Sequence, residues 1–172
     1  MQHSLVMTVI GKDKPGLVEL IASTVAKQGG NWLESRMSHL GGQFAGILRI
    51  EFPSEKETSM VTELKALEKQ SLSVVIHLDL SAVKPSSKPA SSLEIVGHDR
   101  PGIVREISRV LAEHQVNVEE LTSEIASAAM SGENLFKAKA RLQLKSPKDA
   151  ADVREDLEKI ANDLIVDVTF EA

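Results

Sequence analysis

The chain contains one ten-residue stretch twice, once near its start and once just past its middle. Residues 9–18 read VIGKDKPGLV, and residues 95–104 read IVGHDRPGIV. The match continues beyond the stretch, because Asn31 and Asn117 follow it at the same distance. A period near half of the 172 residues, used only twice, predicts two copies of one small domain and not a solenoid.

Each stretch is typical of a strand that runs into a loop and then a helix. Gly11 follows apolar residues and is expected to let the chain leave the sheet with unusual dihedral angles. Lys14 precedes a proline and is biased away from the helical region. Pro15 suits the first helical position, so the backbone N–H groups of Gly16 and Leu17 are expected to lie at the helix start.

This loop offers both signs of charge. N–H groups at a helix start attract carboxylates or phosphates, and Asp13 precedes them with a carboxylate that could receive an ammonium group. An amino acid carries both groups, so the loop is a candidate amino-acid site. The same pattern is also an efficient turn with Asp13 as a helix cap, and this purely structural interpretation stays open.

Composition limits the classes of function. The chain is 42% hydrophobic and 26% charged, which is ordinary for a globular protein. The absence of cysteine excludes disulfides, thiol catalysis and cysteine-ligated zinc. There is no signal-peptide pattern and no apolar run of membrane-spanning length, so we expect a cytoplasmic protein. A net charge of −5 argues against direct binding to nucleic acid.

Hydrophobic periodicity predicts the same order of elements in both halves. Helices are expected after residue 16, after a capping box of Ser54 and Glu57, after residue 102 and after residue 146. Strands are expected at residues 3–10, 31–40, 43–52, 72–80, 93–97, 116–129, 136–144 and 166–170. Glycines at 41–42 and residues 131–134 are the predicted hairpin turns.

The fold class is therefore predicted as α+β, with two ferredoxin-like βαββαβ domains in tandem. Each domain is expected to have a four-stranded antiparallel sheet with two helices on one face. The first domain would span residues 1–82 and the second residues 92–172, with a linker rich in proline and serine at residues 83–91. Apolar residues expected on the outward faces, Val75 and Ile165 among them, predict that domains pack together within the chain or in a dimer.

The strand, the G-x-D-x-P-G-[LI]-V loop, the helix and the asparagine after it resemble the ACT domain, in both copies. The resemblance implies a regulatory module that binds small amino acids between paired domains. It also implies which residues contact the ligand, and His98 is added because it lies in the second loop. The expected ligand-binding residues are Gly11, Asp13, Pro15, Gly16, Leu17, Asn31, Gly97, His98, Asp99, Pro101, Gly102, Ile103 and Asn117.

What the resemblance implies for function is an amino-acid-sensing transcriptional regulator, with glycine as the first candidate ligand. It would act through a protein partner, such as a DNA-binding transcription factor, without binding DNA itself. It could form a homodimer. An alternative is a ligand-responsive regulatory subunit that docks on an enzyme of amino-acid metabolism.

No enzyme class is favoured, and we expect no catalytic residues, metal or cofactor. The histidines do not stand at metal-ligand spacing, and no nucleophile elbow or Walker loop is present. One row of basic residues is expected along a single strand face, either solvated or paired with acids such as Asp167 and Glu171. The row consists of Lys137, Lys139, Arg141 and Lys145.

Overall fold

The computed structural model describes residues 1–79, 90–127 and 133–171. The chain divides into two compact units, Met1–Lys84 and Pro85–Ala172. Most of the predicted linker and the start of the predicted turn at 131–134 lie outside the described residues. Ser91, predicted as the last linker residue, is instead the first residue of a strand, where it is buried and pairs with Leu142.

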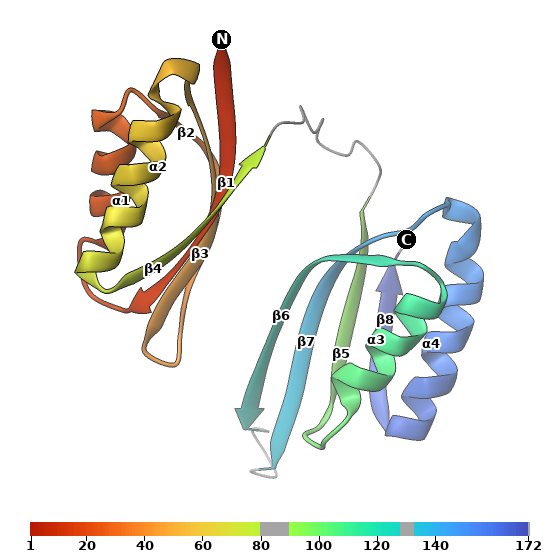
Figure 1. Cartoon of the computed structure of the whole chain (residues 1–172). Coiled ribbons are helices and arrows are strands. Elements are labelled where there is room, and N and C mark those ends of the chain that lie inside the picture. Colours follow the sequence, from red (N-terminus) through yellow and green to blue (C-terminus); the bar gives the residue numbers. More distant parts are fainter. Residues whose placement is uncertain (80–89, 128–132, 172) are drawn as a thin grey trace. The chain divides into compact units, whose positions relative to one another are not determined.

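The first unit has the predicted order of elements (Figure 1). Its sheet has the strand order β2-β3-β1-β4, and every neighbouring pair is antiparallel. The elements are β1 (Gln2–Lys12), α1 (Leu17–Lys27), β2 (Asn31–Leu40), β3 (Gln43–Pro53), the 3-10 turn η1 (Ser54–Lys56), α2 (Glu57–Ala66), the 3-10 turn η2 (Leu67–Gln70) and β4 (Leu72–Asp79).

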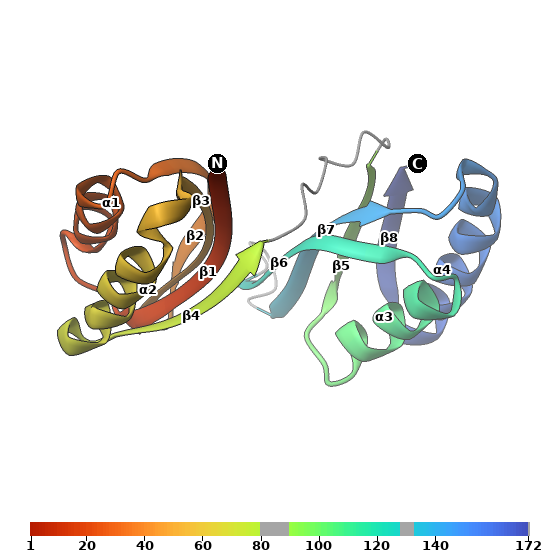
Figure 2. The same ribbon diagram turned by 45° about the horizontal axis from the view of Figure 1, so that its top comes forward.

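The second unit repeats this topology with the strand order β6-β7-β5-β8. Its elements are β5 (Ser91–His98), α3 (Ile103–Glu113), β6 (Asn117–Ser127), β7 (Asn134–Gln143), the 3-10 turn η3 (Pro147–Asp149), α4 (Ala150–Leu164) and β8 (Val166–Glu171). In both views of Figures 1 and 2, α1 and α2 lie on one face of the first sheet, and α3 and α4 lie on one face of the second. The prediction of two ferredoxin-like domains is confirmed.

Each unit has its own aliphatic core between sheet and helices. In the first, Leu5, Met7 and Ile50 on the strands are fully buried against residues such as Ile21 on α1. In the second, Leu93 and Leu142 occupy corresponding places. The helical stripe predicted after residue 102 is confirmed, because Ile103, Ile107, Val110 and Leu111 are all buried. Burial of these stripes drives the helices onto one face of each sheet.

Several local predictions are decided at the element ends. Gly41 and Gly42 have φ of 58° and 77°, which confirms the two-glycine hairpin. The prediction of a capping box formed by Ser54 and Glu57 is wrong. Ser54 already belongs to η1, and the Glu57 carboxylate is hydrogen-bonded to the His3 ring at 2.6 Å. Within the described residues, no helix is both long enough and apolar enough to cross a bilayer.

Candidate functional site

The two loops have the same backbone geometry. Gly16 has φ of 90° and ψ of 0°, and Gly102 has φ of 99° and ψ of −10°. These angles fit the third residue of a type II turn, with a proline before it in the second position. The helices therefore begin one residue after the glycine, and the prediction of Pro15 at the first helical position is wrong. Proline fixes the turn, and glycine provides its positive φ.

Gly11 and Gly97 have a different role from the one expected. Both lie inside strands, Gly11 paired with Leu72 and Gly97 with Val166. A Cβ on Gly11 would come within 2.5 Å of the Ser71 carbonyl oxygen, and one on Gly97 within 2.4 Å of Val166 Cγ1. Glycine is needed at these two positions because an adjacent segment of the same domain leaves no room for a Cβ, and not because the backbone has unusual dihedral angles.

Backbone hydrogen bonds tie each loop to the hairpin of its own sheet. The Asp13 N–H donates to the Gly42 carbonyl at 3.0 Å, and the Asp99 N–H donates to the Asn134 carbonyl at the same distance. Asn134 follows closely after residues 128–132, which lie outside the described residues. The two domains thus have equivalent loop-to-hairpin hydrogen bonds, although the second hairpin turn is longer in the sequence. The backbone at Asp13 and at Asp99 is thus fixed next to Gly42 and Asn134, respectively.

The charged residue before each proline connects the loop to the helical segment before the last strand of its domain, η2 in the first domain and α4 in the second. Lys14 Nζ donates to the Gln70 carbonyl at 3.4 Å, and Arg100 Nη2 donates to the Asp163 carbonyl at 3.2 Å. Both acceptors lie at the C-terminal ends of helical segments, where a cation is favoured. The sequence shows the shared positive charge of the two loops, but this charge does not identify the distant carbonyl that each side chain contacts.

Neither helix start is capped by a side chain. The carbonyls of Gly16 and Gly102 accept the first helical hydrogen bonds, from Leu20 and Glu106. The alternative in which Asp13 caps the helix is therefore not what the structure has. A Cβ built on Gly16 or Gly102 meets no described atom within 4 Å other than those of its chain neighbours and its own helix backbone, so there is free space beside both glycines.

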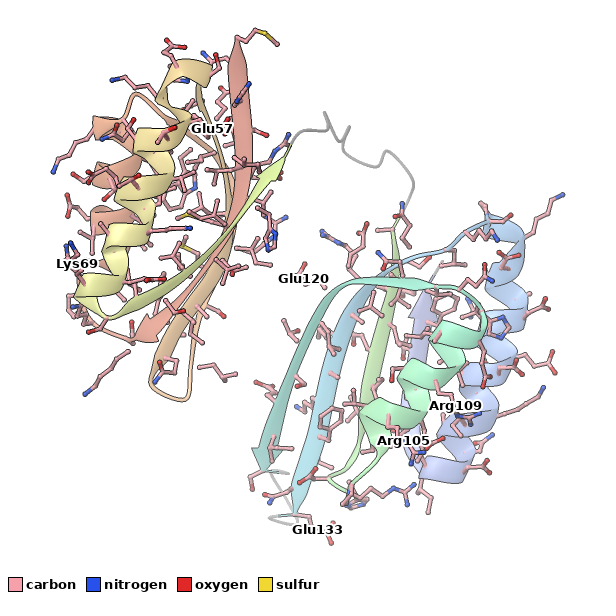
Figure 3. All side chains as sticks on the ribbon, in the orientation of Figure 1. Glu57, Lys69, Arg105, Arg109, Glu120 and Glu133 are labelled. Atoms are coloured by element: carbon pink, nitrogen blue, oxygen red, sulfur yellow. The ribbon has the colours of Figure 1, made fainter. Side chains whose placement is uncertain are left out.

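The acid beside each loop faces a histidine, with the roles exchanged between domains. Asp13 Oδ2 lies 3.7 Å from Nε2 of His39, which comes from β2. In the second domain His98, the last residue of β5, has its Nδ1 3.5 Å from Oε2 of Glu133. Glu133 directly precedes β7 and is labelled in Figure 3. All four side chains are largely exposed, so these pairs contribute little to stability. The two sites are chemically different.

Asn31 and Asn117 are not near the loops of their own domains. Asn31 pairs with Glu51, and Glu51 also pairs with Ser4, so Asn31 is level with the start of β1. Asp13 follows the other end of β1, about 30 Å away at the usual rise per residue. Asn31 Nδ2 donates to Glu51 Oε1 at 3.1 Å. A single bound amino acid therefore cannot contact both Asn31 and Asp13 of the same domain.

Two residues of the basic row, Lys139 and Arg141, are paired with glutamates within the second domain. Lys139 Nζ lies 2.7 Å from Glu94 Oε1, and Arg141 Nε lies 3.1 Å from Glu119 Oε2. The hydrogen bond and charge of Glu94 raise the pKa of Lys139. The expected partners on β8 are wrong, because β5 lies between β7 and β8.

A hollow of about 560 Å³ lies over this charged part of the second sheet, away from the helices. None of the predicted ligand-binding residues lines it. Among the described residues, no three His, Asp or Glu side chains are grouped so that they could hold a metal ion. The lining residues are Glu94, Ile95, Val96, Thr122, Ser123, Glu124, Lys137, Ala138 and Lys139.

Comparison with known proteins gives the same division of the chain. Models of the ACT domain match residues 3–77 and residues 91–131. The glycine cleavage system transcriptional repressor of Escherichia coli is 26% identical over 169 residues, which cover 95% of this chain and 86% of the repressor.

Two solved structures match the whole chain. An unknown protein from Galdieria sulphuraria is 26% identical with a TM-score of 0.87, over 99% of this chain and 98% of its own. A protein with the provisional name of a glycine cleavage system transcriptional repressor is 19% identical with a TM-score of 0.74, over 99% and 97%, and shows the fold alone. With one ACT domain in each half, the chain belongs to the ACT-domain family.

Proposed function

We propose that this protein is an amino-acid-sensing transcriptional regulator of the glycine cleavage system repressor type. The observation that carries the proposal is the similarity to the Escherichia coli repressor, which extends through both ACT domains and is not limited to one. Its role would be regulatory and not catalytic.

The proposed ligand is a small amino acid, with glycine first. Its carboxylate would accept hydrogen bonds from the N–H groups of Gly16 and Leu17, or of Gly102 and Ile103. Its ammonium group would lie at the carboxylate of Asp13 or Asp99. The uncapped helix starts and the open space at both glycines support this arrangement. Asn31 or Asn117 would contribute only if the start of that strand in another domain approached the loop.

Calorimetry of the full chain with glycine, serine and alanine tests ligand binding. A charge-assisted hydrogen bond contributes about 1.5–3 kcal/mol, so Asp13→Ala or Asp99→Ala should weaken binding about tenfold or more. Lys27→Ala is a matched control, because Lys27 lies at the far end of α1. Absence of heat with all three amino acids on the wild type would contradict the proposal.

The proposed mode of regulation is through a protein partner. A ligand that binds one state of such a complex more tightly shifts its population toward that state. Affinity purification of the tagged chain, with and without glycine, should recover a DNA-binding protein in a glycine-dependent amount. Recovery of a metabolic enzyme instead would support a regulatory subunit.

A further inference from the structure

The face of the first sheet that is turned away from the helices is apolar at its centre. Thr8 on β1 pairs with Ile47 on β3 and with Val75 on β4, and Ile10 pairs with Ala45. Residues directly opposite each other point to the same face, so these five side chains form one surface. Ile10, Ile47 and Val75 are 50%, 53% and 51% exposed. We call these five residues the apolar face.

The second sheet provides an internal comparison, because it has the same topology. Glu94 stands in the place of Thr8, and its two partners are Lys139 and Thr169. Lys137 stands in the place of Ala45. The charged pair Glu94–Lys139 is closed at 2.7 Å, and Glu120, labelled in Figure 3, lies 3.8 Å from Arg141. The same face of the second sheet is thus charged, whereas that of the first sheet is apolar, and a contiguous exposed apolar face indicates a covered surface.

We propose that the apolar face is the interface with a second copy of this chain, in which the two first sheets pack face to face. This inference goes beyond amino-acid sensing and does not depend on it. The argument for a second copy is that the face is complementary to itself when it is turned about a two-fold axis parallel to its strands. That rotation puts β2 over the second copy's β4, and β3 over its β1.

Side-chain sizes match in this arrangement. Ile10 would lie over the second copy's Ala45, and Ile47 over its Thr8, so that each large side chain meets a smaller one. Arg36 is the partner of Ile47 on β2 and would lie over Val75, where its aliphatic stem can pack and its guanidinium can reach the rim. Interdigitation of this kind is how two aligned sheets form a sandwich.

The polar residues at the two sides of the face match as well. Arg49 on β3 pairs in register with Glu34 on β2, and Val6 on β1 pairs with both Arg49 and His77 on β4. Glu34 and His77 therefore stand at opposite sides of one row, and the rotation brings each over the other of the second copy. Two such contacts form per dimer.

The area limits the expected affinity. Four strands spaced about 4.8 Å apart and about 26 Å long present roughly 500 Å² per copy. Two copies would bury about 1,000 Å², which is at the lower limit for a specific interface. We therefore expect a dimer with a dissociation constant in the micromolar range.

Sedimentation equilibrium of the full chain tests the proposal. The wild type should be a dimer at concentrations above about 10 µM, as a micromolar constant requires. Ile47→Lys and Val75→Lys should each weaken the dimer at least tenfold. The fold should tolerate lysine at residue 47, because Lys139 occupies the equivalent position in the second domain. Leu121→Lys is the matched control, since Leu121 is 50% exposed on β6, and it should leave the dimer unchanged.

A wild type that is monomeric at high concentration would overturn the proposal, including the case in which this face binds a different protein. So would a dimer that Leu121→Lys disrupts and Ile47→Lys does not. The orientation has its own test. Glu34→Lys should weaken the dimer, and adding His77→Glu should restore it, whereas a double variant as weak as the single one would contradict the two-fold axis.

Discussion

Of the two glycines beside the first loop, Gly11 has less room for a side chain than Gly16. Gly11→Ala would push its Cβ against the Ser71 carbonyl, which is backbone and cannot rotate away. We expect it to destabilise the first domain by about 1–3 kcal/mol, the usual cost of overpacking.

The measurement is urea unfolding followed by fluorescence of Trp32, the single tryptophan, which packs against the first core. Gly41→Ala is the control, because a Cβ there meets open space and only the positive φ is unfavourable. An effect of Gly11→Ala no larger than that of Gly41→Ala would contradict the packing argument.

Asp156 gives the second domain a predictable response to acid. Its hydrogen bond with His114, at 2.9 Å, and then that with Lys159 lower the pKa of Asp156 from its ordinary 3.8. A lowered pKa in the folded state stabilises the fold above the ordinary value, and this contribution is lost as the pH falls through the folded pKa.

Asp156→Asn should therefore lower the melting temperature of the second domain near neutral pH, and the difference from wild type should vanish well below pH 3.8. Scanning calorimetry across this range is the measurement. Glu155→Gln is the control, because Glu155 pairs with the same Lys159 but is not bonded to His114. A difference that persists unchanged in acid would show that Asp156 acts by packing alone.

At the scale of elements, the end of α4 carries a strained residue. Ile165 has φ of 53° and ψ of 51° at the C-cap and is 73% exposed. A β-branched residue in this left-handed region costs about 1–2 kcal/mol. Its exposure thus comes from a helix end, and the prediction that it lies on an outward sheet face is wrong.

Ile165→Asn should stabilise the second domain by about 1 kcal/mol, because asparagine tolerates the left-handed region. Scanning calorimetry should show a higher melting temperature for the second domain. Ile165→Val keeps the branched Cβ and should give no gain. Stabilisation by both substitutions would indicate that removal of exposed apolar surface, and not backbone strain, is the cause.

At the scale of the whole molecule, the charge distribution is unfavourable for DNA. The net charge is −5, and Lys139 and Arg141 of the basic row are already paired with glutamates. Binding to DNA depends on neutralising phosphates with lysine and arginine. The pure protein should therefore give no shift of promoter DNA in a gel at low salt. Tight binding that weakens steeply with salt would make the basic row a DNA-binding surface.

The order of helices and strands, the two domains and the turn glycines were predictable from the sequence. Hydrophobic residues recur every two residues in a half-buried strand and every 3.6 residues in a helix, and turns depend on single glycines and prolines. Residues close together in the sequence are therefore enough to predict both. The equivalence of the loops followed from the repeat. The position of Lys14 and Arg100 against the helical segment before the last strand did not, because that contact joins distant parts of the chain.

Only the tertiary structure decided which residues meet across the sheets. Strand order puts β5 between β7 and β8, and so pairs Lys139 with Glu94 instead of an acid on β8. Register puts Asn31 at the opposite end of the sheet from Asp13, although both follow the repeated motif. Strand order and register are set by contacts between segments far apart in the chain, and the alternation within one strand carries no information about its neighbours.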